Sequence, residues 1–91
     1  MPPRKRKVRC GLTIEQYDEL LRLQGNGCAI CHRPPFKRRL AVDHNHRTGR
    51  IRGLLCYHCN YGIGVFRDSV KKLRAAADYL EKRDKLETTN G

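Results

Sequence analysis

The sequence lacks tryptophan and any long apolar run. Its 91 residues contain no Trp and are 38% hydrophobic, and no stretch approaches the roughly 20 apolar residues of a membrane-spanning helix. The basic residues 1–9 are not followed by the apolar segment that a secretory signal peptide requires. These absences argue against a membrane-embedded or a secreted protein, so we expect a soluble, cytoplasmic chain.

Acidic residues are also scarce. Nine Asp and Glu stand against 20 Lys and Arg, which gives a net charge of +11. The positive excess lies mainly in residues 1–9 and 28–60, and Asp43 is the single acidic residue of the second segment. Clustered positive charge favours a polyanionic partner, most commonly nucleic acid, although a solvated basic surface is the alternative. A lone carboxylate in such a segment suggests a bound metal ion.

Cysteine is present in a pattern that fits a metal site. A chain of this length buries a small core and commonly needs a metal or disulfides for stability. Two Cys-x-x-Cys pairs together supply four thiolates, a closed tetrahedral shell that suits Zn²⁺. Two disulfides are the alternative, but they are rare in proteins that are not secreted. We therefore predict structural zinc at Cys28, Cys31, Cys56 and Cys59, with Cys10 as a free thiol.

Local patterns predict a small α+β fold. Thr13 and Gln16 have the spacing of a helix-capping box, and Asp68 or Ser69 can cap the last helix. Gly62 and Gly64 should weaken the end of the preceding helix. The predicted elements are a helix over 13–24, a hairpin with strands 40–42 and 51–55, a short helix over 57–63, and a helix ending near Lys85 with Val70, Leu73, Ala77 and Leu80 on its apolar face.

The same composition predicts three segments. Residues 1–12 should be a flexible basic arm, residues 13–86 a single domain, and residues 87–91 a disordered tail.

Candidate catalytic residues lie between the cysteine pairs. Asp43 is a hard oxygen ligand suited to Mg²⁺ or Mn²⁺, and His44 has an intrinsic pKa suited to taking a proton from water. Adjacent side chains on a strand point to opposite faces, so both can serve one site only if the backbone turns there. Asn60 can be a second oxygen ligand, oriented by the zinc ligand Cys59. Taken alone, the Asp-His pair reads as a surface pair, His46 as a loop histidine and Asn60 as a helix cap.

Taken together, these motifs resemble a known nuclease site. A strand, loop, strand and helix with His and Asn around one metal is similar to the HNH, or ββα-metal (His-Me finger), site. Over residues 13–80 the chain resembles the recombination endonuclease VII family of phage nucleases. The motifs that carry the resemblance are Cys28-x-x-Cys31, Leu40-x-Val42-Asp43-His44-x-His46-x-Thr48-Gly49 and Arg52-Gly53-Leu54-Leu55-Cys56-x-x-Cys59-Asn60.

The resemblance implies a role for each of these residues. The fold would be a zinc-stapled ββα-metal domain flanked by an N-terminal and a C-terminal helix. Asp43 and Asn60 would hold a catalytic divalent ion (Mg²⁺ or Mn²⁺, or else Ni²⁺), and His44 would be the general base. His46 would contact the scissile phosphate. A phage or prophage origin, and so the cytoplasm of the host cell, follows from the resemblance alone.

The sequence therefore predicts a metal-dependent DNA endonuclease. We expect low sequence specificity, because phosphate contacts carry no sequence information. Related resolvases form dimers through a long C-terminal region, and this chain ends soon after Leu80, so we expect a monomer that nicks duplex DNA. The alternatives are a dimeric structure-selective (Holliday-junction) resolvase and a non-catalytic zinc-finger module. The predicted DNA contacts are Arg47, Arg50 and Arg52, with Arg4, Lys5, Arg6 and Lys7 of the arm.

Overall fold

The computed structural model describes residues 11–85. The predicted basic arm (Arg4, Lys5, Arg6 and Lys7), Cys10 and the tail 87–91 lie outside these residues. The chain divides into two compact units, one up to Asn60 and one from Tyr61 onward. The extent of a single domain over 13–86 stays a prediction. Within residues 11–85, no helix is both long enough and apolar enough to cross a membrane.

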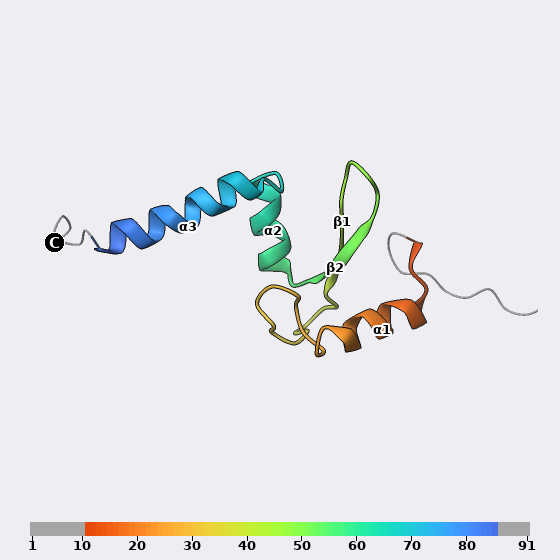
Figure 1. The fold of residues 1–91 in the computed structure, drawn as a ribbon. Helices are drawn as coiled ribbons and strands as arrows, with labels where there is room; N and C mark the ends of the chain where they lie inside the picture. The colour runs from red at the N-terminus through yellow and green to blue at the C-terminus, as the bar shows by residue number, and fades with distance from the viewer. Residues whose placement is uncertain (1–10, 86–91) are drawn as a thin grey trace, which may run out of the picture. The chain divides into compact units, whose positions relative to one another are not determined.

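The described residues form a small α+β fold with a two-stranded antiparallel hairpin and three helices (Figure 1). The elements are α1 (Ile14–Leu23), β1 (Ala41–His44), β2 (Ile51–Leu55), α2 (Tyr57–Val65) and α3 (Val70–Lys85). The predicted second strand is confirmed, whereas the first strand continues beyond Val42 to His44. Asp43 and His44 therefore belong to the hairpin itself.

Helix α1 begins with the predicted capping box. The Thr13 hydroxyl accepts a hydrogen bond from the Gln16 backbone N–H at 3.1 Å, and the Gln16 side chain accepts one from the Thr13 N–H at 2.9 Å. The buried Tyr17 donates its hydroxyl to the Leu40 carbonyl oxygen at 2.6 Å. This bond ties α1 to the residue that precedes β1.

The buried core is small and lies where α1, the first cysteine pair and the hairpin meet. Its members in the described residues are Tyr17, Cys28, Leu40, Leu54 and Leu55. A core of this size stabilises a fold weakly, so a metal bound by the cysteines would add to the stability of the first unit.

Helix α2 runs two residues past its predicted end and includes Gly62 and Gly64. Neither glycine has a left-handed backbone, so both cost helix stability without ending the helix. The helix ends where Arg67 and Asp68 adopt positive φ angles of 54° and 59°. Their N–H groups close the turn onto carbonyl oxygens of α2.

Helix α3 is capped by Ser69, whose hydroxyl accepts a hydrogen bond from the Lys72 N–H at 3.1 Å. Of the two predicted caps, Ser69 is therefore the one used. The predicted apolar face is largely exposed, since Val70 is 60% exposed and Leu80 is 62% exposed. This face adds little to the core of the described residues.

Candidate active site

Each Cys-x-x-Cys pair forms a turn, called a knuckle: the first holds Cys28 and Cys31, and the second holds Cys56 and Cys59. The four cysteines lie in one cluster. Their Sγ atoms are all within 4.8 Å of one another, and the sulfurs of Cys31 and Cys56 are 3.7 Å apart. Zinc–sulfur bonds of about 2.3 Å in a tetrahedron place the sulfurs about 3.8 Å apart. The cysteines form no disulfides. The donor set and its spacing suit one structural Zn²⁺, as the sequence predicted.

Local hydrogen bonds shape both knuckles. The Ile30 N–H points at the Cys28 sulfur and the Cys59 N–H at the Cys56 sulfur, each at 3.4 Å. The first knuckle is closed by Cys28, whose N–H donates to the Arg33 carbonyl oxygen at 2.9 Å. A Cβ on the buried Gly27 would overlap the His32 carbonyl oxygen, so only glycine fits before Cys28.

The thiols of the cluster cannot all ionise without a cation. Burial raises the pKa of Cys28, but hydrogen bonds from backbone N–H groups, including that of Ile30, outweigh burial and lower the pKa to about 6. Burial, together with hydrogen bonds to the neighbouring thiols, raises the pKa of Cys59 to about 12. Neighbouring groups of like charge resist joint ionisation. A divalent cation at the centre would remove this conflict.

The candidate catalytic side chains share one cleft. Asp43, His44, His46 and Asn60 all line a cleft of about 760 Å³ within the first unit. The imidazole rings of His44 and His46 are 4.6 Å apart, centroid to centroid, and tilted by 59°. Asn60 lies in the first turn of α2, directly after the zinc-cluster residue Cys59. The hairpin and the helix thus bring together residues that are up to 17 positions apart (43 to 60).

A β-bulge lies in the hairpin beside the candidate catalytic residues of β1. Asp43 pairs with Gly53 and His44 pairs with Ile51, so Arg52 is an extra residue on β2. Such a bulge bends the strand and changes the direction of nearby side chains. The irregular pairing of the hairpin therefore falls beside Asp43 and His44, with its extra residue on β2.

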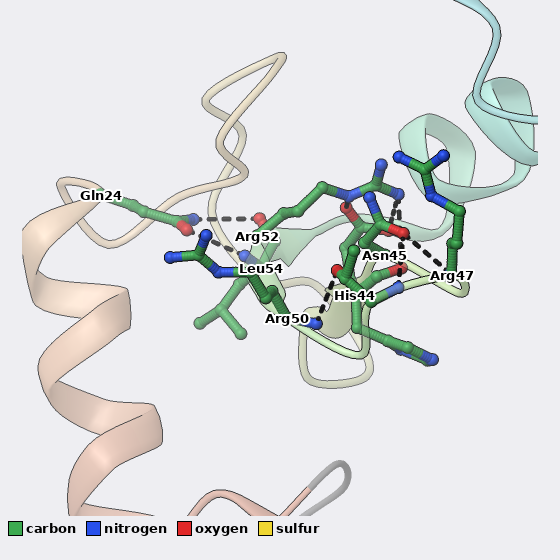
Figure 2. Close-up of polar contacts among 9 residues, drawn as sticks. Gln24, His44, Asn45, Arg47, Arg50, Arg52 and Leu54 are labelled. Atoms are coloured by element: carbon green, nitrogen blue, oxygen red, sulfur yellow. Dashed lines mark hydrogen bonds and ion pairs between the residues drawn. The ribbon is translucent and has the colours of Figure 1, made fainter.

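Arg52 is bound to Asp43. Its Nε donates to Asp43 Oδ2 at 2.8 Å and its Nη2 donates to Oδ1 at 3.0 Å, a two-pronged ion pair. The same Nη2 lies 3.4 Å from the His44 carbonyl oxygen, and Figure 2 shows the side chain reaching toward His44. The Asp43 side chain is only 11% exposed. The sequence treated Arg52 as a DNA contact and did not anticipate this partner.

The connection between the strands is organised by Asn45. Its side-chain oxygen accepts hydrogen bonds from the N–H groups of Arg47 and Thr48 at 2.8 and 3.1 Å (Figure 2). Its backbone N–H donates to the Arg50 carbonyl oxygen at 2.8 Å. Arg47 and Arg50 are both exposed, and within residues 11–85 neither forms an ion pair. Both remain available to a phosphate backbone.

Asp43 and Asn60 offer the oxygen donors that a hard divalent ion prefers. A carboxylate and an amide oxygen are suitable Mg²⁺ or Mn²⁺ ligands, and such ions usually keep further positions for water and substrate phosphates. In the described part of the chain, the Asn60 side-chain amide has no hydrogen-bond partner. The donor set therefore fits a catalytic metal, with the Arg52 ion pair as a competitor for Asp43.

Sequence reasoning missed three residues at or near the cleft. Arg38 and Arg39 line it beside His44, although the sequence showed only a basic loop. Gln24 donates to the Gly27 carbonyl oxygen at 2.9 Å. It also donates to the Leu54 carbonyl oxygen at 3.0 Å and accepts from the Leu54 N–H at 2.9 Å (Figure 2). The basic run 37–39 was the available signal for the arginines. No local pattern marks Gln24, because Leu54 is 30 residues away.

Comparison with known proteins supports the resemblance. The chain is 50% identical over 74 residues to the Gene 59 protein of Mycobacterium phage D29, covering 79% of this chain and 45% of that protein. It is 44% identical over 72 residues to the Gene 59 protein of Mycobacterium phage L5, covering 77% and 44%. The chain thus spans less than half the length of these relatives. No solved structure gives a significant match.

The family comparison covers most of the chain. The model of the family described as recombination endonuclease VII matches residues 3–82. That span includes both cysteine pairs and all four candidate catalytic residues, and the family description suggests nuclease activity. The chain therefore belongs to the recombination endonuclease VII family.

Proposed function

We propose that this protein is a metal-dependent DNA endonuclease of the HNH type. The observation that supports this most directly is the single cleft lined by Asp43, His44, His46 and Asn60, next to a cluster of four cysteines. A zinc-binding module without catalysis would need the cysteines but gives no reason for Asp43, His44 and Asn60 to line one cleft. Family membership independently suggests nuclease activity.

The order of elements supports a ββα-metal fold for this site. The hairpin carries Asp43 and His44 on β1, and α2 follows with Asn60 in its first turn. The cysteine cluster joins the first knuckle to the start of α2. A structural zinc would therefore hold in place the helix that presents Asn60.

In this proposal His44 is the general base. It takes a proton from a water molecule, whose oxygen forms a bond to phosphorus while the bond from phosphorus to the 3′ oxygen breaks. The products are a 5′-phosphate and a 3′-hydroxyl, the departing oxygen receiving a proton from solvent. His46, whose ring lies beside that of His44, contacts the phosphate and its developing charge.

Asp43 and Asn60 would hold the divalent ion in the cleft. When bound, Mg²⁺ or Mn²⁺ supplies a Lewis acid for the phosphate and for the charge on the departing oxygen. To serve as a ligand, Asp43 must share its carboxylate with Arg52 or release it. Arg47, Arg50 and Arg52 then contact the DNA backbone, which positions the strand without reading its sequence.

The proposed product is a nick. One active centre per chain cuts one strand, so a monomer converts supercoiled plasmid to open circles. A dimeric structure-selective resolvase is the alternative, and it would cut two strands together. Light scattering on the protein bound to DNA separates the two assemblies.

The test is plasmid cleavage by zinc-loaded protein with and without Mg²⁺ or Mn²⁺, alongside His44→Ala. We expect metal-dependent open circles from the wild type and a loss of at least about 100-fold in the variant, the usual scale for a general base. The variant should keep its zinc and its affinity for DNA. Tight DNA binding with no cleavage under any divalent metal would refute the nuclease and leave a binding module.

A further inference from the structure

The segment Arg38–Leu40 separates two hollows on the first unit. One is the cleft of the proposed catalytic residues. The other is a hollow of about 270 Å³ lined by Phe36, Arg38 and Tyr57 among other residues. Arg38, Arg39 and Leu40 line both. The two hollows are therefore neighbours, with Arg38–Leu40 in the wall of each.

The second hollow combines exposed aromatic rings with positive charge. Phe36 is 78% exposed and Tyr57 is 59% exposed. Four cations and no acidic residue line the hollow, and the cations are Arg33, Lys37, Arg38 and Arg39. The chain reverses at Lys37, which has a φ of 69°, and the Lys37 ammonium lies 5.5 Å from the centre of the Phe36 ring.

The two arginines between the hollows are held in place by rings. The Arg38 guanidinium lies 5.4 Å from the centre of the Tyr57 ring, and that of Arg39 lies 5.5 Å from the Tyr17 ring. Tyr17 is buried, and Tyr57 follows the cluster residue Cys56 directly. Each cation therefore lies near a ring that belongs to the core or directly follows a residue of the cysteine cluster.

We propose that the second hollow binds the nucleotide next to the scissile phosphate of a single DNA strand. Phe36 stacks on its base, and Arg38 with Arg39 contacts the flanking phosphate. Stacked aromatic rings beside a basic track are the means by which proteins hold single strands without reading sequence. This assignment rests on the proposed function, since it is the cleft that defines where the scissile phosphate lies.

The absence of tryptophan allows a direct test of stacking. Phe36→Trp introduces a single Trp into the hollow, and Tyr79→Trp introduces one on α3 at another exposed aromatic position (59% exposed, against 78% for Phe36). We titrate each with oligothymidylate of about 12 nucleotides, without added divalent ions. The proposal is supported if the oligonucleotide quenches the fluorescence of Phe36→Trp but not that of Tyr79→Trp. Equal responses from the two proteins would overturn it.

Affinity measurements separate the base from the phosphate. Phe36→Ala and Arg38→Ala should each weaken binding of the oligonucleotide about tenfold. On an abasic strand of equal length, Phe36→Ala should have no effect while Arg38→Ala still weakens binding. The matched controls are Tyr79→Ala and Arg83→Ala, because Arg83 lies 5.6 Å from the Tyr79 ring on α3. Equal losses in the variants and their controls would show non-specific charge and overturn the proposal.

Failure of this inference can be told from failure of the proposed function. If the wild type cleaves plasmid but Phe36→Ala and Tyr79→Ala bind the oligonucleotide equally well, only the assignment of the second hollow as a strand site is overturned. Selective binding losses in a protein that never cleaves would refute the nuclease and support the strand site.

Discussion

Arg52 holds both oxygens of Asp43, the carboxylate that we propose as a metal ligand. The pair is only partly exposed, with 11% of the Asp43 side chain accessible, so solvent screens it less than a surface pair. A guanidinium and a divalent ion compete for the same carboxylate and repel each other. The ion pair therefore sets how tightly the proposed catalytic metal binds.

We expect Arg52→Gln to bind Mn²⁺ about tenfold more tightly in the absence of DNA, because one positive charge beside the site is removed. Titration of zinc-loaded protein followed by electron paramagnetic resonance measures this directly. Arg74→Gln on α3 makes the same change in charge outside the first unit and should leave the affinity unchanged. Weaker binding by Arg52→Gln would mean that Arg52 orients Asp43 and does not compete with the metal.

At the scale of elements, the Gln24 side chain takes the place of a third strand. It pairs with both the N–H and the carbonyl oxygen of Leu54, a residue with 0% exposure. Without it, the outer edge of β2 would carry a buried N–H with no partner, since Ala29 can satisfy only the carbonyl oxygen. The end of α1 is thereby joined to the strand that leads into the second knuckle.

Gln24→Leu keeps the size of the side chain and removes its hydrogen bonds. We expect a loss of about 1–3 kcal/mol in the free energy of unfolding, the usual cost of leaving a buried polar group unpaired. Urea denaturation of the zinc-loaded protein measures it. Leu23→Ala, at an exposed position one residue earlier, should change stability far less. Equal losses would argue that Gln24 contributes only general packing.

Alanine substitutions at two glycines should change stability in opposite directions. Gly27→Ala should destabilise the first unit by at least about 2 kcal/mol, because the new Cβ overlaps the His32 carbonyl oxygen and disturbs the knuckle. Gly62→Ala in α2 meets no atom within 4 Å and should add about 0.5–1 kcal/mol of helix stability. Thermal melting of both variants, with zinc content measured, tests whether the first loses stability and the second gains it. A neutral Gly27→Ala would mean that the knuckle can shift.

At the scale of the whole molecule, a zinc ion in the cysteine cluster would connect the first Cys-x-x-Cys pair to the start of α2. We expect chelation of one zinc per chain to unfold the hairpin and α2, since binding of structural zinc is folding free energy. Added Mg²⁺ should not restore cleavage. Affinity for zinc should fall as the pH falls, because protons compete for the thiolates. Circular dichroism with a colorimetric zinc assay follows both changes.

Single cysteine substitutions provide the matched comparison. Cys31→Ser removes a cluster sulfur and should lose zinc and secondary structure together. Cys10→Ser, which changes the fifth cysteine of the sequence, should retain both. Loss of zinc in Cys10→Ser would show that this thiol takes part in the metal site.

Several features could be predicted because they depend on neighbours in the chain. The capping box of α1 involves residues three positions apart, and each knuckle brings together cysteines that are three positions apart. The hydrophobic pattern located β2 at its observed bounds. The end of α2 was predicted too early, because its glycines weaken the helix without ending it. The helix ends where the chain turns, at Arg67 and Asp68.

The sequence by itself determined the family, the four zinc-binding candidates and the residue types of the candidate site. Only the tertiary structure decided that Arg52 engages Asp43, that Gln24 completes β2, and that Arg38 divides two hollows. The physical reason is the separation along the chain of the residues that interact. Knuckles and caps are specified by spacing along the chain, whereas these contacts join side chains from separate segments whose meeting depends on the bulge, the core and the metal cluster.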